Sequence, residues 1–255
     1  MTNPIIKLSN ITKTFGDKTI LNNLDLQVNK GESLVIIGGS GTGKSVTLKC
    51  ILGLLKIDSG SINIFDRDIE KSSINEKQEI LKKIGMLFQG SALFDSLNVW
   101  QNISFGLIKG KRIKQSLAKE IAIEKLTQVG LKKDIANLYP SELSGGMQKR
   151  VALARAIATD PEIIFFDEPT TGLDPIMANV INDLINNIVR KIGATALSIT
   201  HDIESAKKIA DKISMLHEGK IIWTGLSSEL EKTNNKHVKQ FIHGKTEGPI
   251  EINLT

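Results

Sequence analysis

Residues 38–45 read Gly-Gly-Ser-Gly-Thr-Gly-Lys-Ser and fit the pattern G-x-x-x-x-G-K-[ST]. An apolar run, Leu34–Ile37, precedes them, and a helical run, Val46–Leu55, follows. Glycines let backbone N–H groups converge on phosphate oxygens, and the N-terminus of the next helix adds partial positive charge. In this motif the lysine reaches the β- and γ-phosphates and the final serine ligates Mg²⁺. The alternative, a purely structural glycine turn, does not explain the flanking strand and helix. We therefore expect a nucleotide to contact Gly38, Gly39, Ser40, Gly41, Thr42, Gly43, Lys44, Ser45 and Val46.

Strand-like runs recur along the chain, and each is followed by a turn and a helical stretch. These runs are Leu34–Ile37, Ile84–Phe88, Ile163–Phe166, Thr195–Ile199 and Ile213–Leu216. The alternation predicts an α/β fold with a mostly parallel core sheet and helices on both faces. The N-terminal runs are shorter, partly alternating and joined by tight turns. Together they predict a small antiparallel sheet from Ile5–Leu8, Thr19–Leu21, Leu24–Val28 and Ser61–Phe65.

A helical insertion interrupts the strand pattern between Gln89 and Leu143. Within Ile113–Val129, apolar residues recur at helical spacing. We therefore predict a nucleotide-binding core from residues 1–89 and 159–243, and a helical subdomain from residues 90–158. Residues 244–255 form a separate C-terminal tail.

The tail alternates apolar and polar residues. Ile250, Ile252 and Leu254 are separated by Glu251 and Asn253, after a break at Lys245–Pro249. A period of two suits a sheet edge or a groove. We expect the tail to pack against a second copy of the chain, the alternative being a solvated, disordered end.

The amino-acid composition argues against secreted, membrane-spanning and nucleic-acid-binding proteins. The 255 residues contain one cysteine, and 33 Lys and Arg against 28 Asp and Glu give a net charge of +5. The N-terminus lacks the apolar segment of a secretory signal, and the apolar runs are far shorter than the ~20 residues that cross a bilayer. The chain is therefore expected to be cytosolic. Aromatic residues make up 4% of the sequence, and the bases are spread along it, which argues against nucleic-acid binding.

Two carboxylates end the most apolar predicted strand. Asp167 directly follows Ile163–Phe166, and Glu168 follows Asp167. An aspartate at this place can hold the Mg²⁺ shell, and a glutamate one residue on can polarise the attacking water. Glu168 is therefore the candidate general base and Asp167 a candidate metal ligand. The alternative is an exposed acidic pair that caps the turn at Pro169.

A second helix start carries a serine and two glycines. Leu143–Gln148 reads Leu-Ser-Gly-Gly-Met-Gln and precedes a helical run, Lys149–Ala158. A hydroxyl and glycine amides at a helix N-terminus form a second phosphate-binding end. Taken alone, this pattern is equally well an ordinary helix cap.

Taken with Gln89 and His201, which follow two of the predicted strands, these motifs resemble those of the ATP-binding cassette family over nearly the whole chain. The resemblance implies that Phe15 stacks on adenine and that Gln89, the Q-loop residue, contacts Mg²⁺ and the γ-phosphate. It further implies nucleotide contacts from the signature residues Ser144, Gly145 and Gly146, from Asp174 of the D-loop and from His201, the switch histidine. With Lys44 and Glu168, Gln89 and His201 complete the catalytic set. Two departures are Phe15, where tyrosine is commoner, and Met147, where glutamine is frequent.

The family resemblance also implies an assembly. Two chains would face head to tail across a twofold axis and enclose two ATP molecules with Mg²⁺, each signature serine contacting the ATP held by the other chain. This homodimer would dock on separate integral-membrane permease chains at the cytoplasmic face of the inner membrane. The segment Ser91–Phe94 after Gln89 is the expected docking site, unless Leu93 and Phe94 only pack the helical subdomain.

Three stretches are similar to the ATPases of the Mla-type lipid transporters of Gram-negative bacteria: Leu87–Phe105, Thr170–Ile185 and Val238–Ile250. Phospholipid, handled by partner chains, is the expected cargo. Importers of amino acids or other small solutes share most of these motifs and remain the alternative. Soluble cassette proteins of DNA repair or translation usually bring tandem cassettes or long coiled-coil inserts. A P-loop kinase would need an acceptor pocket in place of the second phosphate-binding helix.

Overall fold

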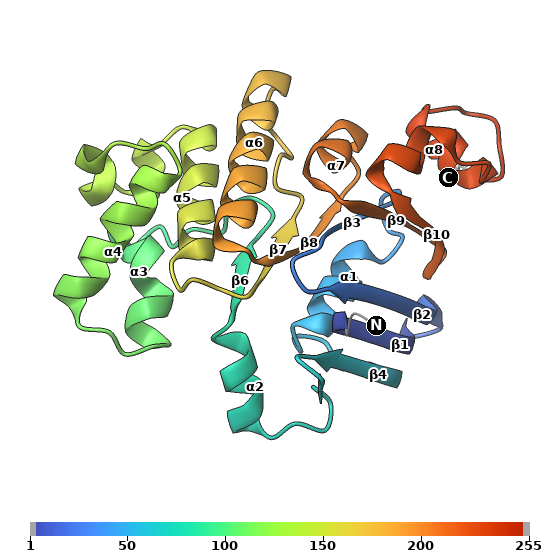
Figure 1. The fold of residues 1–255 in the computed structure, drawn as a ribbon, viewed down its shortest axis with the longest axis horizontal. Coiled ribbons are helices and arrows are strands. Elements are labelled where there is room, and N and C mark those ends of the chain that lie inside the picture. The colour runs from blue at the N-terminus through green and yellow to red at the C-terminus, as the bar shows by residue number, and fades with distance from the viewer. Residues whose placement is uncertain (1–3, 252–255) are drawn as a thin grey trace. The chain divides into compact units, whose positions relative to one another are not determined.

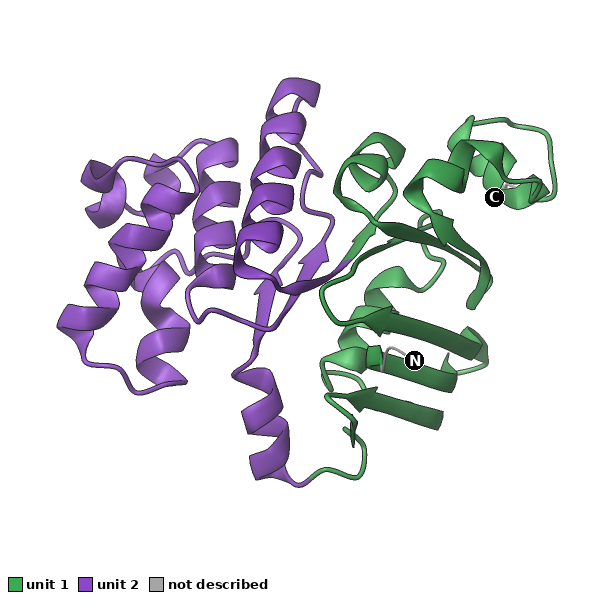
Figure 2. Ribbon diagram, in the orientation of Figure 1, with its two compact units in different colours: residues 1–72, 198–255 green, residues 73–197 purple. Residues whose placement is uncertain are grey.

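The protein is described here by a computed structural model, which covers residues 4–251. The chain divides into two compact units, residues 1–72 with 198–255 and residues 73–197 (Figure 2). The boundary at residue 197 falls within strand β8, Thr195–Thr200. The sequence-based division into core, helical subdomain and tail stays a prediction.

The first unit contains an antiparallel sheet, as expected. Its order is β2-β1-β4-β5, formed by β1 (Pro4–Phe15), β2 (Lys18–Asn29), β4 (Ser59–Ile64) and β5 (Arg67–Asp68). The prediction of separate runs at Thr19–Leu21 and Leu24–Val28 was wrong, because both lie on β2. The pairing register with β1 shifts here, and Asn23 adopts a positive φ of 49°. A β-bulge therefore absorbs the polar pair Asn22–Asn23 without ending the strand.

The rest of the first unit surrounds the glycine-rich loop. Strand β3 (Ser33–Ile37) pairs in parallel with β9 (Lys212–His217), which pairs antiparallel with β10 (Lys220–Leu226). The helical segments of this unit are α1 (Lys44–Ile51), α7 (Ile203–Ile209), η3 (Ser227–Lys232) and α8 (Lys236–Ile242). Helix α1 begins two residues before the predicted start and ends four residues early. Gly53, with a φ of 68°, follows its last turn.

The second unit is mostly helical. Strand β6 (Ile84–Leu87) pairs in parallel with β7 (Ile163–Asp167). Helices α3, α4 and α5 pack against one another (Figure 1). The helical segments are α2 (Ile74–Leu81), α3 (Val99–Lys109), α4 (Gln115–Gln128), η1 (Lys133–Asn137), η2 (Pro140–Glu142), α5 (Gly145–Ile157) and α6 (Pro175–Ile192). Between Gln89 and Leu143 the structure contains α3, α4, η1 and η2, while the helical subdomain of residues 90–158 stays a prediction.

The core sheet has six strands in the order β10-β9-β3-β8-β7-β6. The β3–β9 and β6–β7 pairs are parallel and the β9–β10 pair is antiparallel. The α/β class with a mostly parallel sheet and a separate antiparallel sheet is therefore confirmed. Within residues 4–251, no helix is both long and apolar enough to span a bilayer.

Candidate active site

The glycine-rich loop of the first unit needs its glycines for two physical reasons. Gly38, Gly41 and Gly43 have φ values of 157°, 74° and 106°, which side-chain-bearing residues rarely adopt. A Cβ on Gly38 would lie 2.4 Å from the carbonyl oxygen of Leu216, and one on Gly43 would lie 2.9 Å from Leu21 Cδ2. The loop therefore keeps a bare backbone, as a phosphate cradle requires.

Helix α1 begins directly after this loop and has no side-chain cap within the described structure. The first-turn N–H groups of a helix lack intrahelical acceptors and carry partial positive charge, so they suit phosphate oxygens. The buried Lys44 ammonium donates hydrogen bonds of 2.7 and 2.8 Å to the carbonyl oxygens of Gly38 and Gly39. Ser45, the predicted Mg²⁺ ligand, is partly exposed on the first turn. The donors present fit a nucleotide phosphate group with its cation.

Phe15, the predicted adenine-stacking residue, ends strand β1 with 46% of its surface exposed. The Lys13 ammonium lies 5.2 Å from the centre of its ring. A half-exposed aromatic face beside a cation offers a nucleotide base both stacking and charge.

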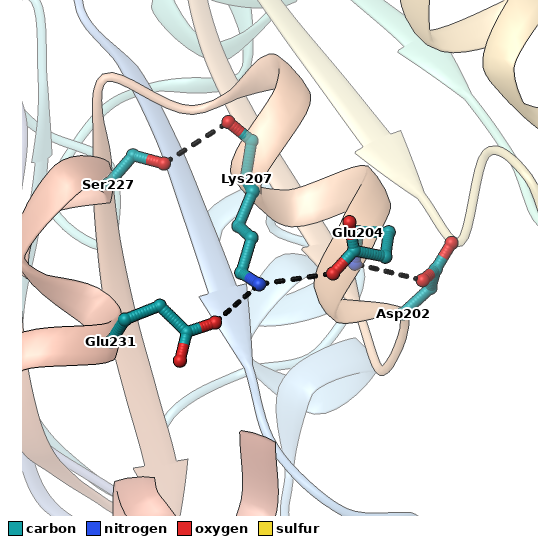
Figure 3. A network of polar contacts seen from close by, with 5 residues as sticks. All are labelled: Asp202, Glu204, Lys207, Ser227 and Glu231. Atoms are coloured by element: carbon teal, nitrogen blue, oxygen red, sulfur yellow. Dashed lines mark hydrogen bonds and ion pairs between the residues drawn. The ribbon is translucent and has the colours of Figure 1, made fainter. Parts of the chain in front are cut away.

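His201, the predicted switch histidine, is exposed and follows β8 immediately. The next residue, Asp202, caps α7 by accepting a hydrogen bond from the Glu204 N–H. Lys207 of α7 forms ion pairs with Glu204 of the same helix and with Glu231 of η3, as Figure 3 shows. Hydrogen bonds to Glu231 and Glu204 raise the pKa of Lys207. The helix behind His201 is thereby fastened at both ends.

In the second unit, the two predicted carboxylates lie at the end of β7. Asp167 is the last residue of the strand, and Glu168 follows it in the left-handed region with a φ of 48°. Non-glycine residues in this region are strained and often functional. Glu168 is 8% exposed and its Oε2 accepts a hydrogen bond of 3.1 Å from the Thr171 hydroxyl. Glu168 is therefore held in place by its own turn, so the alternative of an exposed acidic pair fails for it.

Lys149 of α5 is a charged neighbour that the sequence did not reveal. It is 4% exposed, and within residues 4–251 its ammonium has no hydrogen-bond partner. Burial lowers the pKa of Lys149, while the charges of Asp167 and Glu168 oppose that change. A lysine on a predicted helix resembles a surface residue, so only the structure associates it with the carboxylates.

The signature residues start α5, four residues before the predicted helix start at Lys149. Ser144 is exposed, and its hydroxyl accepts a 3.4 Å hydrogen bond from the Met147 N–H, which starts the helix at Gly145. A Cβ on Gly146 would lie 2.6 Å from Met177 Cε, so a larger residue there would displace the end of the Met177 side chain. Asp174 caps α6 by accepting hydrogen bonds from the N–H groups of Ile176 and Met177. Its predicted contact with nucleotide stays a prediction.

Gln89 is exposed after β6 and leads into the loop of residues 91–98. Asn102, fully buried in α3, holds the far end of this loop. Its amide group accepts from Phe94 N–H at 2.8 Å and donates to the carbonyl oxygens of Phe94, Leu97 and Asn98.

Arg155 of α5 holds the near end of the same loop. Its guanidinium donates hydrogen bonds of 2.7 Å to the carbonyl oxygens of Ser91 and Ala92, two residues with positive φ. Within the described residues it makes no ion pair, and burial lowers its pKa. The helix that starts at Ser144 therefore also fixes the loop after Gln89. Asn102 and Arg155 act through long-range contacts that sequence patterns do not reveal.

Beside this loop the second unit has an apolar hollow of about 450 Å³. The rings of Phe94 and Phe105 are 4.7 Å apart on its wall, and both are more than a third exposed. Phe94 is therefore only partly packed within the helical unit. The hollow is lined by Ile84, Gly85, Met86, Phe88, Ala92, Phe94, Phe105, Gly106, Arg155, Ala156 and Thr159.

A phosphate cradle before α1 and a carboxylate pair after a buried strand define a nucleotide hydrolase of the P-loop class. The chain belongs to the ABC transporter family, whose family model, described as ABC transporter, matches residues 21–171. It is thus an ABC ATPase, which binds ATP and hydrolyses it to power transport.

Among curated relatives, the chain is 41% identical to "Intermembrane phospholipid transport system ATP-binding protein MlaF" of Haemophilus influenzae, over 99% of this chain and 95% of that protein. It is also 41% identical to "Probable ribonucleotide transport ATP-binding protein mkl" of Mycobacterium tuberculosis, over 96% of this chain and 68% of that protein. Among solved structures it resembles a dimeric post-hydrolysis state of the ATP-binding cassette MJ0796 with bound ADP and Pi. The TM-score is 0.79 at 33% identity, covering 87% of this chain and 98% of that one.

Proposed function

We propose that this ABC ATPase works as a homodimer on separate permease chains and drives the movement of phospholipid across the cell envelope, from the cytoplasmic face of the inner membrane. The observation that carries the proposal is the similarity to MlaF, because it spans 99% of this chain and so includes both phosphate-binding helices and the tail.

The residues divide the work of hydrolysis. Lys44 and the amides that start α1 bind the phosphates, while Ser45, Asp167 and Gln89 would hold Mg²⁺. When bound, Mg²⁺ neutralises charge on the β- and γ-phosphates. Glu168 takes the proton of the attacking water, and His201 contacts the γ-phosphate. Phe15 stacks on the base.

Helix α5, which begins at the signature residues, supports a composite site, meaning a nucleotide site to which both chains of the dimer contribute residues. Ser144 and Gly145 are exposed, and nothing within 4 Å would meet a Cβ on Gly145. An anion-binding helix start that faces solvent suits a phosphate supplied from outside this chain. In the proposed dimer that phosphate is the γ-phosphate of ATP bound to the partner copy.

The name of the mycobacterial relative points to a competing cargo, ribonucleotide, at the same identity. Affinity purification of the tagged chain from detergent-solubilised membranes, followed by mass spectrometry, separates the two. We expect a multi-spanning membrane protein to copurify together with bound phospholipid. Absence of any membrane chain would contradict the transport proposal. If only nucleotide cargo stimulated the ATPase activity of the complex, phospholipid would be excluded as the cargo.

We propose that the permease docks at the loop of residues 91–98 and the apolar hollow. Single cysteines at positions 91–96 are expected to cross-link to a cytoplasmic loop of the permease, because this loop is fixed at both ends and bears the exposed Phe94. The native Cys50 does not interfere, since burial raises the pKa of its thiol to about 11. Cysteines at the exposed positions Lys132 and Lys133 serve as controls. Cross-links from the control positions alone would exclude this docking site.

The tail forms contacts with its own helix α8 as far as it is described. The buried Gln240 accepts a 2.7 Å hydrogen bond from Ile250 N–H and donates to the carbonyl oxygens of Ile250 and Lys245. A Cβ on Gly248, whose φ is 154°, would lie 2.4 Å from Gln240 Cδ. Ile250 is half-buried, whereas Ile252 and Leu254 lie outside the described residues.

We propose that the tail continues from this anchor onto the partner copy. Deleting residues 246–255 should then lower the yield of nucleotide-free dimer or permease-bound complex and leave ATP binding by the monomer unchanged. Each apolar side chain that becomes buried contributes ~1.5–3 kcal/mol, enough to hold a short extended segment. Equal complex yield from the truncated and intact chains would mean that the tail is only a chain end.

A further inference from the structure

A second and larger recess in the helical unit is strongly basic. It has a volume of about 1060 Å³ and lies between the ends of α2 and α3. Its charged lining residues are the bases Lys82, Lys83, Lys109, Lys111 and Arg112 and a single acid, Glu79. We call this recess the basic groove. Five of its twelve lining residues are basic, compared with 33 of 255 in the chain, so the charge is concentrated here.

Nearby carboxylates neutralise only part of the positive charge of the groove. Lys82 pairs with Glu79 at 2.6 Å and Lys83 pairs with Glu162 at 2.8 Å. Lys111 donates to the carbonyl oxygen of Thr159, which carries no charge. Within residues 4–251, Lys109 and Arg112 form no ion pair, and both are exposed. Several like charges in one recess repel one another, which favours an acidic occupant.

The basic groove adjoins the apolar hollow, because the two recesses share three lining residues. Ile84, Gly106 and Thr159 line both recesses. The hollow presents Phe88, Phe94 and Phe105. A single extended peptide bound across both recesses would therefore contact an apolar surface at one end and a basic surface at the other.

We propose that the basic groove binds an acidic segment of the partner chain whose apolar side chains enter the hollow. This inference rests on the proposed docking of a permease and adds its chemistry: carboxylates beside large apolar residues on one cytoplasmic segment. A flat bilayer surface contacts protruding side chains and does not fill a recess, so the concave shape favours a polypeptide over anionic lipid.

Zero-length cross-linking tests the contact directly. A carbodiimide joins a lysine amine to a carboxylate only when the two touch. On the complex purified with its membrane chain, we expect cross-links from Lys82, Lys83, Lys109 or Lys111 to Asp or Glu of that chain. Cross-links confined to lysines outside the groove would overturn the inference while leaving permease docking intact. If no membrane chain copurifies with the wild-type protein, the proposed function and the inference fall together.

Charge reversal provides a second, independent measurement. The double variant Lys109→Glu/Arg112→Glu should retain at least ~10-fold less membrane chain, because like charges across an interface are strongly unfavourable. The matched control Lys132→Glu/Lys133→Glu reverses two exposed lysines of the same unit and should retain wild-type amounts. Basal ATPase activity of both isolated variants should be unchanged. If the two variants retained equal amounts of the membrane chain, the inference would be overturned. It would also be overturned if the groove variant kept the membrane chain and lost only its cosedimentation with phosphatidylglycerol vesicles.

Discussion

Replacing Glu168 by glutamine is expected to lower ATP turnover ~10²–10⁴-fold, the usual cost of losing a general base. ATP binding should be retained, because glutamine preserves the size of the side chain and can still accept the 3.1 Å hydrogen bond from Thr171. Turnover is measured as phosphate release at saturating ATP, and binding by equilibrium titration of the same preparation.

Lys44→Ala is the comparison that separates chemistry from binding. It removes the ammonium that the loop carbonyl oxygens of Gly38 and Gly39 hold. We expect this variant to lose ATP affinity, whereas Glu168→Gln keeps it and traps ATP. If both variants lose affinity to the same degree, the assignment of Glu168 as the base is wrong. The strained φ of 48° at Glu168 makes a folding control necessary, and thermal unfolding of the variant provides it.

The parts of the fold that the sequence predicts well are those with local causes. The buried strands β3 and β7 each contain a four-residue apolar run. Gly38, Gly41 and Gly43 adopt backbone conformations that larger residues rarely adopt. Helix α2 also had a local signal that was missed. Ser73 and Glu76 form a capping box, in which each side chain bonds the backbone N–H of the other.

Other features depend on contacts between distant residues and have no such signal. Arg155 and Ser91 are 64 residues apart, yet their hydrogen bond fixes the loop after Gln89. Lys149 lies on a helix and has the sequence character of a surface residue, yet it is 4% exposed and the charges of Asp167 and Glu168 act on its pKa. The start of α5 was also predicted late, because glycines occupy its first turn. Glycine disfavours a helix interior but is tolerated next to a capping serine such as Ser144.

Ser144→Arg is expected to abolish ATP hydrolysis. The fall in turnover should be at least the ~10²-fold that accompanies loss of one group stabilising transition-state charge. Ser144 is exposed at the start of α5, so a bulky side chain there has room in the monomer but none in the proposed contact with the partner's ATP. ATP binding by the monomer should be unchanged, since Lys44 and the glycine-rich loop belong to the other unit.

The hydroxyl of Ser144 also caps α5, so the steric effect must be separated from loss of the cap. Ser144→Ala removes the same hydrogen bond at a cost of ~1 kcal/mol without adding bulk. In the chain without residues 246–255, where the tail cannot hold the dimer, we expect Ser144→Ala to form an ATP-dependent dimer with reduced turnover. In the same truncated chain we expect Ser144→Arg to stay monomeric with ATP in light-scattering measurements. Full ATPase activity in Ser144→Arg would falsify the composite site, because the serine would then have no role across the twofold axis. Equal loss of dimer in both variants would instead assign the effect to the helix cap and leave the contact with the partner's nucleotide without support.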